Sequence, residues 1–352
     1  KLDSILLASE TIKPFQNKKD NRSLKRDFIA SIDDNTRAWE IKNGTNSPLH
    51  KIFEHIREHT VKDKVSLFIT ESIMSYTQGD LVGAQYSNID TLGLSGKMKI
   101  EFDDLQKSGC AVSILAFKSQ YNGTYTDFAN NSYPCCKESR PYYIWVVGKA
   151  NVIPNFMAHL LKNNDIKPEQ QAHFGWTIPV PAYAILPQVK RGGGWQYDTE
   201  TKVPQKIMGI KVSEENAFTI AIDLSGDIFN KLFTENYLKN NLELVTNQGY
   251  AKASKVEIYT QKEILKDPTV TSEQKQEITK YTHFVYVKLD NESLAEDVGK
   301  FMVRLKKNNE FKWFATWSAN HATENTNLGR TYGFYSLTKP LLTAYQTDKY
   351  YF

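Results

Sequence analysis

The chain has 352 residues, of which 40% are hydrophobic and 24% are charged, so its composition is that of a globular protein and excludes an intrinsically disordered one. Its 44 basic and 40 acidic residues leave a net charge of +4 without long runs of like charge, which argues against a nucleic-acid-binding surface. Three cysteines are too few for a disulfide framework, and no apolar run of about 18 residues predicts a membrane span.

The first half of the chain alternates helix and strand patterns, which is typical of a doubly wound α/β sheet. A helix is expected from Pro48, because proline suits the first helical position behind a Ser47 cap. A strand is expected next, at 65–70. Four apolar residues of the helix have the spacing of one buried face: Leu49, Ile52, Phe53 and Ile56.

The pattern of helices and strands continues after a loop at 78–96, which is rich in Gly, Ser and Asp. A helix that ends at Gly109 is followed by apolar strands at 111–117 and 141–148. The near-continuous apolar run of the first of these strands is typical of a parallel strand that is covered on both faces. A further helix is expected around Phe156.

A change of pattern divides the chain into two expected domains. Residues 163–165 and Pro168 interrupt the last helix, so we expect an α/β domain at 1–165 and a second domain at 166–352. The second half predicts a mostly β, sandwich-like domain with an aromatic C-terminal segment and a final helix. Its strand-like runs lie at 177–186, 206–212, 217–224, 241–245, 255–259, 283–289 and 300–305.

Two polar segments are expected to meet at the carboxyl edge of the first sheet. One is the loop 44–47, which enters the helix, and the other is Glu71, which follows the strand 65–70. In an α/β sheet, the carboxyl end of a strand and the loop that enters a helix both face the ligand-binding edge. Thr45 and Glu71 are therefore predicted to contribute to one site.

These segments resemble the von Willebrand factor type A family, whose cation site takes a threonine from a Gly-Thr loop and a carboxylate from a strand that ends in Thr-Asp-Gly. The resemblance covers about residues 25–163 and implies a Rossmann-like fold, with Thr45 and Glu71 on the family's metal-site threonine and aspartate. The family's Asp-x-Ser-x-Ser segment does not occur within residues 1–40, and a hard cation needs about six oxygen ligands. The resemblance therefore implies a degenerate site with no cofactor or weakly bound Mg²⁺ or Ca²⁺, and with Ser47 as a residual contact to a partner.

A second motif points to a different metal. Residues 55–59 read His-Ile-Arg-Glu-His, which matches the His-x-x-Glu-His pattern of inverted zinc peptidases, and His55 and His59 would share one helix face. That family needs a further carboxylate ligand and a much larger catalytic fold. We therefore interpret the motif as a free helix surface, an interpretation that bound zinc would reverse.

Two aromatic segments are candidate recognition surfaces. A long insertion between sheet strands is more often functional than structural, and the excursion at 118–140 is such an insertion. Its candidate residues are Tyr121, Tyr125, Tyr133 and Arg140. For the segment at 313–334, aromatic packing between domains is the alternative to ligand contact. Its candidate residues are Trp317, His321 and Arg330.

The sequence contains no convincing nucleophile or acid–base pair, which favours a non-catalytic function. We predict a protein-binding or scaffold protein with a degenerate cation-dependent adhesion site and a protein partner. The alternatives are a metal-dependent hydrolase that uses Glu71, Thr45 and either His55 or His59, and a structural component of a larger envelope or injection assembly. Abundant Asn and Tyr with few Cys suit a bacterial surface protein, so a cell-envelope or secreted location is slightly favoured over the cytoplasm, and the oligomeric state is open.

Overall fold

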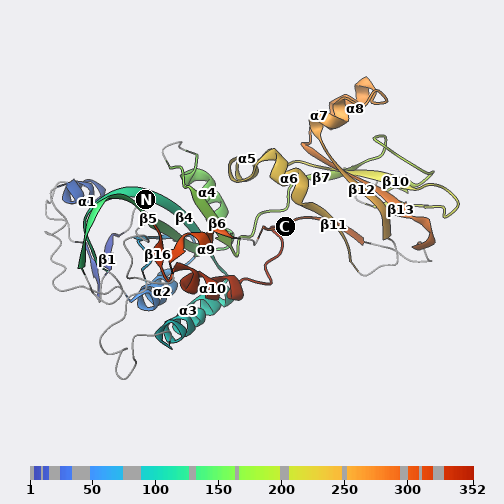
Figure 1. The fold of residues 1–352 in the computed structure, drawn as a ribbon. Helices are drawn as coiled ribbons and strands as arrows, with labels where there is room; N and C mark the ends of the chain where they lie inside the picture. Colours follow the sequence, from blue (N-terminus) through green and yellow to red (C-terminus); the bar gives the residue numbers. More distant parts are fainter. Residues whose placement is uncertain are drawn as a thin grey trace. The chain divides into compact units, whose positions relative to one another are not determined.

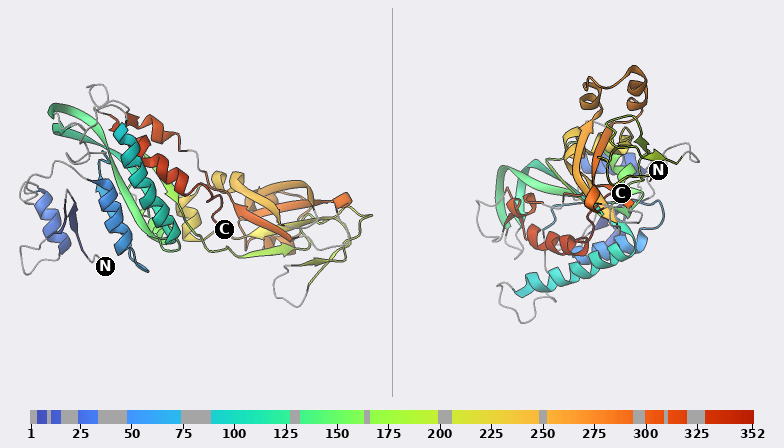
Figure 2. Two further views of the ribbon diagram at one scale, coloured as in Figure 1. Left: turned by 90° about the horizontal axis from the view of Figure 1, so that it is seen from below. Right: turned by 90° about the vertical axis from the view of Figure 1, so that its right-hand side faces the viewer.

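The computed structural model divides the chain into two compact units, each of which is described by itself (Figures 1 and 2). The first unit comprises Lys1–Ile153, Lys167–Gly175 and Asn309–Thr347, and the second comprises Pro154–Ile166, Trp176–Asn308 and Asp348–Phe352. The structure describes residues 4–8, 11–15, 24–33, 48–73, 89–126, 132–162, 166–198, 206–247, 252–293, 300–308, 311–319 and 329–352. This division differs from a single boundary near residue 165, because the chain returns to the first unit before its end.

The first unit is built on a four-stranded sheet with the order β3-β5-β4-β6. Its strands are β3 (Ser66–Thr70), β4 (Cys110–Thr126), β5 (Ser132–Lys149) and β6 (Gln170–Phe174). All three pairings are antiparallel, so the expected parallel sheet is wrong for these strands. A central antiparallel strand that is buried on both faces has the same apolar run as a parallel one, and the run at 111–117 therefore did not reveal the strand direction.

Three helices cover one face of this sheet: α2 (Leu49–His59), α3 (Ile89–Lys107) and α10 (Phe334–Ala344) (Figure 2). Phe53 of α2 lies at the centre of the core, where its ring contacts Phe68, Phe102 and Trp145 at centroid distances of 6.0, 5.1 and 5.0 Å. These T-shaped contacts join two helices to two strands, and aromatic pairs of this kind add about 0.5–1.5 kcal/mol each beyond the burial of their area.

The local predictions for this unit are largely confirmed. Helix α2 begins at Leu49, one residue later than expected, because Pro48 occupies the N-cap position; its four apolar residues are buried as expected. Helix α3 is followed by Gly109, which has the left-handed φ of +69° that glycine adopts without strain at the end of a helix. The helix begins at Ile89, however, and so takes up part of the loop that was expected at 78–96.

Smaller elements complete the first unit. Ala8 and Ile12 pack against the core, each from one strand of a short antiparallel pair. The remaining elements are β1 (Leu6–Ala8), β2 (Ile12–Pro14), α1 (Leu24–Asp33), α9 (Trp313–Thr316), β15 (Ser318–Ala319) and β16 (Thr331–Tyr332).

The C-terminal helix α10 is confirmed as a helix, but it lies in the first unit and not in a domain at 166–352. Its residues Phe334, Leu337 and Leu341 are fully buried in the core of the first sheet. Beyond the helix, the Tyr345 hydroxyl donates a hydrogen bond of 2.7 Å to the carbonyl oxygen of Cys110. The apolar pattern predicted this helix and its buried face, but it could not identify the sheet that the face covers.

The second unit contains a four-stranded antiparallel sheet with the order β12-β13-β10-β7, and an antiparallel pair β11-β14. Every run that the sequence marks as strand-like in this half overlaps a strand. These are β7 (Tyr183–Leu186), β9 (Ile207–Met208), β10 (Ala217–Ile222), β11 (Leu242–Asn247), β12 (Lys252–Thr260), β13 (His283–Asp290) and β14 (Lys300–Leu305). Strand β9 pairs with β8 (Gln196–Tyr197). The ring of Phe218 in β10 lies 5.8 Å from that of Phe301 in β14, so the strand pair packs against the larger sheet.

The second unit also has short helices that the strand pattern did not predict. They are α5 (Asp227–Leu232), α6 (Glu235–Asn241), α7 (Gln261–Leu265) and α8 (Ser272–Ile278). Helices α7 and α8 place Ile264 and Ile278 in a core with Phe284 of β13. Both helices begin with a capping box, Thr260 with Glu263 and Thr271 with Gln274, and this spacing is the signal by which the sequence identifies them.

Helix α4 (Ile153–Leu160) forms where Phe156 predicted it. Within the described residues, every helix is too short or too polar to cross a membrane.

Replacing Leu337 by Ala tests the placement of α10. Leu337 is fully buried, so the cavity is expected to lower the free energy of unfolding of the first unit by about 2–5 kcal/mol. Lys339→Ala, at an exposed position of the same helix, is the matched control and should cost less than about 0.5 kcal/mol. The rate of hydrogen exchange of the β4 amides should increase in Leu337→Ala and should not change in Lys339→Ala. Faster exchange in β10 and β13 instead would assign the helix to the second unit.

His173 in β6 predicts a pH dependence of stability. Its Nδ1 atom lies 3.1 Å from Ser113 Oγ, and burial lowers the pKa of the imidazole to about 3. The unfolded chain binds this proton near pH 6.5, whereas the folded chain binds it only near pH 3. The free energy of unfolding therefore loses nothing to His173 above about pH 6.5, and it falls by up to about 1.4 kcal/mol per pH unit as the pH decreases from there toward 3.

The free energy of unfolding of His173→Gln, measured in urea between pH 7 and pH 4, should therefore fall less steeply than that of the unmodified chain. His159→Gln, which removes an exposed imidazole from α4, is the comparison variant. Equal slopes for His173→Gln and the unmodified chain would contradict the assignment.

Candidate functional site

The turn after β3 is fixed by two hydrogen bonds. The Ser72 backbone N–H donates to Thr70 Oγ1 at 3.0 Å, and the indole Nε1–H of Trp145 donates to Ser72 Oγ at 2.9 Å. Ser72 is fully buried and has a φ of +54°, a conformation that costs free energy for a residue other than glycine. The hydrogen bond from Trp145 holds the turn in this conformation. This conformation also fixes the position of Glu71, the residue before Ser72.

Glu71, the expected carboxylate of a cation site, forms an ion pair with Arg140. Arg140 Nη2 lies 3.2 Å from Glu71 Oε2, and the two side chains are 6% and 44% exposed, respectively. Arg140 lies in β5, three residues before Tyr143. Tyr143 is the residue that pairs with Thr70 in the β3-β5 register. The guanidinium of Arg140 thus contacts one oxygen of the Glu71 carboxylate, and a metal ion that bound at this oxygen would have to displace the guanidinium.

A third segment joins this end of the sheet. The Tyr143 hydroxyl donates to Thr331 Oγ1 at 3.0 Å, and the Tyr143 ring stacks on Phe334 with a centroid distance of 4.1 Å and an interplanar angle of 12°. Burial raises the pKa of the Tyr143 phenol, so the hydroxyl remains protonated as a donor. Residues from β3, β5 and β16 therefore meet at one place.

Residues 118–126 and 132–140 of the excursion form the two strands of a hairpin arm, a regular pairing that the sequence did not predict. The pairing of β4 with β5 continues from Lys118 and Pro141 to Thr126 and Ser132, with an irregularity between Tyr121 and Gly123 (Figure 1). In the β4-β5 register, the backbone positions of Tyr125 and Tyr133 are directly opposite each other, and Tyr121 is opposite Glu138. The sequence predicted that Tyr121, Tyr125 and Tyr133 belong to one insertion, and the structure places them on the two paired strands of the arm.

Trp317 lies in the core of the first unit and is only 8% exposed, so its ring packs within one unit, whereas the packing alternative for its segment was packing between domains. The Nζ atom of Lys118 sits over its ring, 4.8 Å from the centroid. Arg330, from the same stretch of sequence, is exposed. Trp317 thus contacts the start of the hairpin arm through Lys118, while Arg330 is exposed.

Three candidate residues, Thr45, Ser47 and His321, lie outside the described residues. Their predicted roles therefore stay predictions, as does the meeting of Thr45 with Glu71. The described part of the chain contains no group of three or more His, Cys, Asp or Glu side chains that could hold one metal ion.

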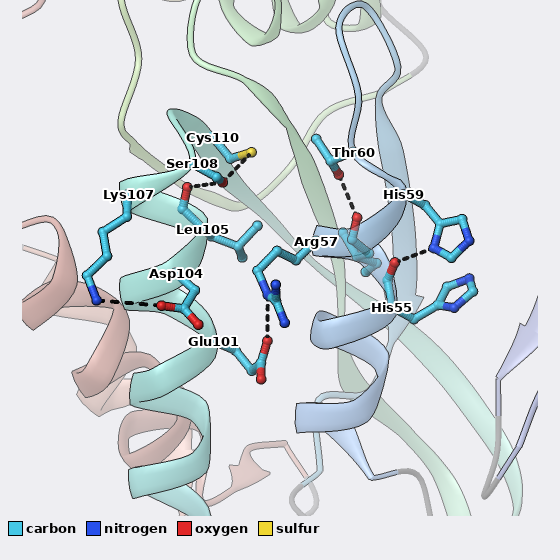
Figure 3. Close-up of polar contacts among 11 residues, drawn as sticks. His55, Arg57, His59, Thr60, Glu101, Asp104, Leu105, Lys107, Ser108 and Cys110 are labelled. Atoms are coloured by element: carbon cyan, nitrogen blue, oxygen red, sulfur yellow. Dashed lines mark hydrogen bonds and ion pairs between the residues drawn. The ribbon is translucent and has the colours of Figure 1, made fainter.

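The histidines of the His-x-x-Glu-His motif lie on one face of α2, as the spacing predicts (Figure 3). Their ring centroids are 4.0 Å apart, and His59 Nδ1 lies 2.8 Å from the carbonyl oxygen of His55. Burial is the main cause that lowers the pKa of His55, and the neighbouring His59 lowers it further. Arg57 points the other way, to α3, where its Nε is 3.1 Å from Glu101 Oε2.

The contacts that build this site were not visible in the sequence. Glu71 and Arg140 are 69 residues apart, and Tyr143 and Thr331 are 188 apart. The one local signal is the strand pattern at 141–148, which identified the element that carries Tyr143 and Trp145.

Comparisons of the chain with protein-family models, with curated proteins and with solved structures give no match.

Ser72→Ala tests the lock on the β3 turn. The substitution leaves the buried indole N–H of Trp145 without its acceptor, so the free energy of unfolding should fall by about 1–3 kcal/mol. Ser72→Gly removes the same acceptor but suits the positive φ, and should be less destabilising than Ser72→Ala. Urea unfolding of both variants gives the comparison. Equal stability of Ser72→Ala and the unmodified chain would show that the hydrogen bond does not hold the turn.

Proposed function

We propose that the chain is a non-catalytic protein-binding or scaffold protein, and that it binds its protein partner through the hairpin arm of β4 and β5. The observation that carries the proposal is the length of this hairpin. Strand β3 pairs with β5 over residues 143–147, and β6 pairs with β4 over 112–116, whereas β4 and β5 go on pairing to Thr126 and Ser132. Among the described strands, the outer part of the hairpin pairs with itself alone.

The burial of β4 changes at the start of the arm. Residues 111–116 are buried in the sheet, whereas Lys118, Ser119 and Gln120 are exposed. A two-stranded ribbon by itself is marginally stable in water, and its open edges offer backbone hydrogen bonds to another chain. Tyrosine adds large contact area with few rotatable bonds, which makes it frequent in protein-binding surfaces. An arm that carries Tyr121, Tyr125 and Tyr133 therefore suits a protein partner.

The base of the arm is held firmly. Phe117 stacks on Tyr142 across the two strands, with ring centroids 5.1 Å apart. Arg140 of β5 forms an ion pair with Glu71, and Nζ of Lys118 in β4 lies over the ring of Trp317. A fixed base lowers the conformational entropy that is lost on binding, and this supports affinity.

Glu71 has a structural role in this proposal, as the partner of Arg140. We propose accordingly that the chain uses no cofactor, or binds Mg²⁺ or Ca²⁺ weakly at a degenerate site with Thr45. A relation of the first unit to the von Willebrand factor type A family stays a proposal that rests on residues 43–75. The antiparallel sheet is the feature that such a relation must accommodate.

The test uses the full chain as bait for partner capture, followed by a binding titration with each captured protein. Tyr125→Ser with Tyr133→Ser should weaken saturable binding at least tenfold, because the arm loses two large contact residues. The matched control is Tyr197→Ser with Tyr335→Ser, which removes two exposed tyrosines from other elements and should leave binding unchanged.

The outcomes separate the proposal from its alternatives. Binding that survives the arm substitutions and is lost with the control would place the interface elsewhere. Turnover of a substrate that requires Glu71, with no saturable protein partner, would favour the hydrolase instead.

A further inference from the structure

Helix α2 presents two histidines side by side on a surface that the hairpin arm does not use. His55 and His59 are four residues apart, so they lie one turn apart on the same face. Their rings are stacked, with centroids 4.0 Å apart and an interplanar angle of 28°. Figure 3 shows both rings projecting from α2 on the side away from Glu101 and α3.

The hydrogen bond of His59 determines which nitrogen is free to bind a metal ion. A carbonyl oxygen can only accept, so the contact of 2.8 Å between His59 Nδ1 and the His55 carbonyl oxygen requires the proton on Nδ1. In the neutral ring, the lone pair is then on Nε2. Histidines that bind metal ions in proteins commonly have this arrangement, in which the other ring nitrogen donates to a backbone carbonyl and fixes the ring.

We propose that His55 and His59 form a two-histidine chelate for a divalent transition-metal ion, with Cu²⁺, Ni²⁺ and Zn²⁺ as the class of ligand. Imidazole nitrogens bind these ions at about 2.0–2.1 Å, so two nitrogens that share one ion lie about 3 Å apart. Two rings that are already stacked at 4.0 Å reach this spacing by small rotations of their side chains. Water completes the coordination, because two protein ligands leave positions open.

The chelate differs in chemistry from the degenerate cation site proposed at Glu71. Mg²⁺ and Ca²⁺ prefer oxygen ligands and should not compete for two imidazoles. Affinity for nitrogen ligands rises from Ni²⁺ to Cu²⁺ and falls again at Zn²⁺, so Cu²⁺ should bind most tightly. The inference does not depend on the proposed protein-binding function, since α2 lies on the sheet and not on the arm.

The test is a titration of the full chain, without a polyhistidine tag, with Cu²⁺ and Zn²⁺ against a chromophoric chelator. One ion per chain should bind at the tightest site, and His55→Ala or His59→Ala should weaken this binding at least tenfold. His159→Ala is the matched control, because it removes an exposed helical histidine that has no histidine one turn away, and it should leave the affinity unchanged.

A second variant separates metal binding from a purely structural role of His59. In His59→Cys, a thiolate replaces the imidazole as a ligand, so Zn²⁺ binding should be recovered relative to His59→Ala. The electron paramagnetic resonance spectrum of the Cu²⁺-loaded chain should show two equatorial nitrogens, and one in His55→Ala. Affinities of both alanine variants within twofold of the unmodified chain, or no binding at micromolar Cu²⁺, would overturn the proposal.

Discussion

The antiparallel pairing of β4 with β5 is the constraint on which the first unit depends. Strand β3 adds to the free edge of β5 and β6 to that of β4, so the register of the central hairpin sets the register of the whole sheet. Alternate residues of both strands face the helices, and a slip of one residue would turn Trp145 and Val112 away from the core. The burial of these side chains thus fixes the backbone pairing.

The same register assembles the end of the sheet at which Glu71 lies. Because Thr70 is opposite Tyr143, the turn after β3 comes beside Arg140 and Trp145 of β5. Ser72, which is buried at this turn with a positive φ, is held by a hydrogen bond from Trp145 of the core in addition to the local one with Thr70. At this end of the sheet, several segments are therefore held together, and β4 and β5 continue from here into the hairpin arm.

Local patterns predicted most elements, and the errors have a common cause. The apolar spacing of α2, the glycine after α3 and the strand-like runs of the second half were each sufficient to locate an element. The strand alternation of the second half did not predict α7 and α8, whose local signal is a capping box at the start of each helix. The predicted parallel direction of β4 was wrong, because a strand that is buried on both faces has the same apolar run whether its neighbours are parallel or antiparallel.

The sequence by itself determined which segments become helices or strands and which of their faces are buried, because side-chain spacing of 3.6 or 2 residues is a local property. It also determined that His55 and His59 share a helix face. Only the tertiary structure decided that Arg140 meets Glu71, that α10 covers the first sheet, and that the tyrosine-rich excursion is a paired arm. The physical reason is that strands pair through backbone groups that are the same in every residue, so the choice of partner rests on burial summed over distant segments.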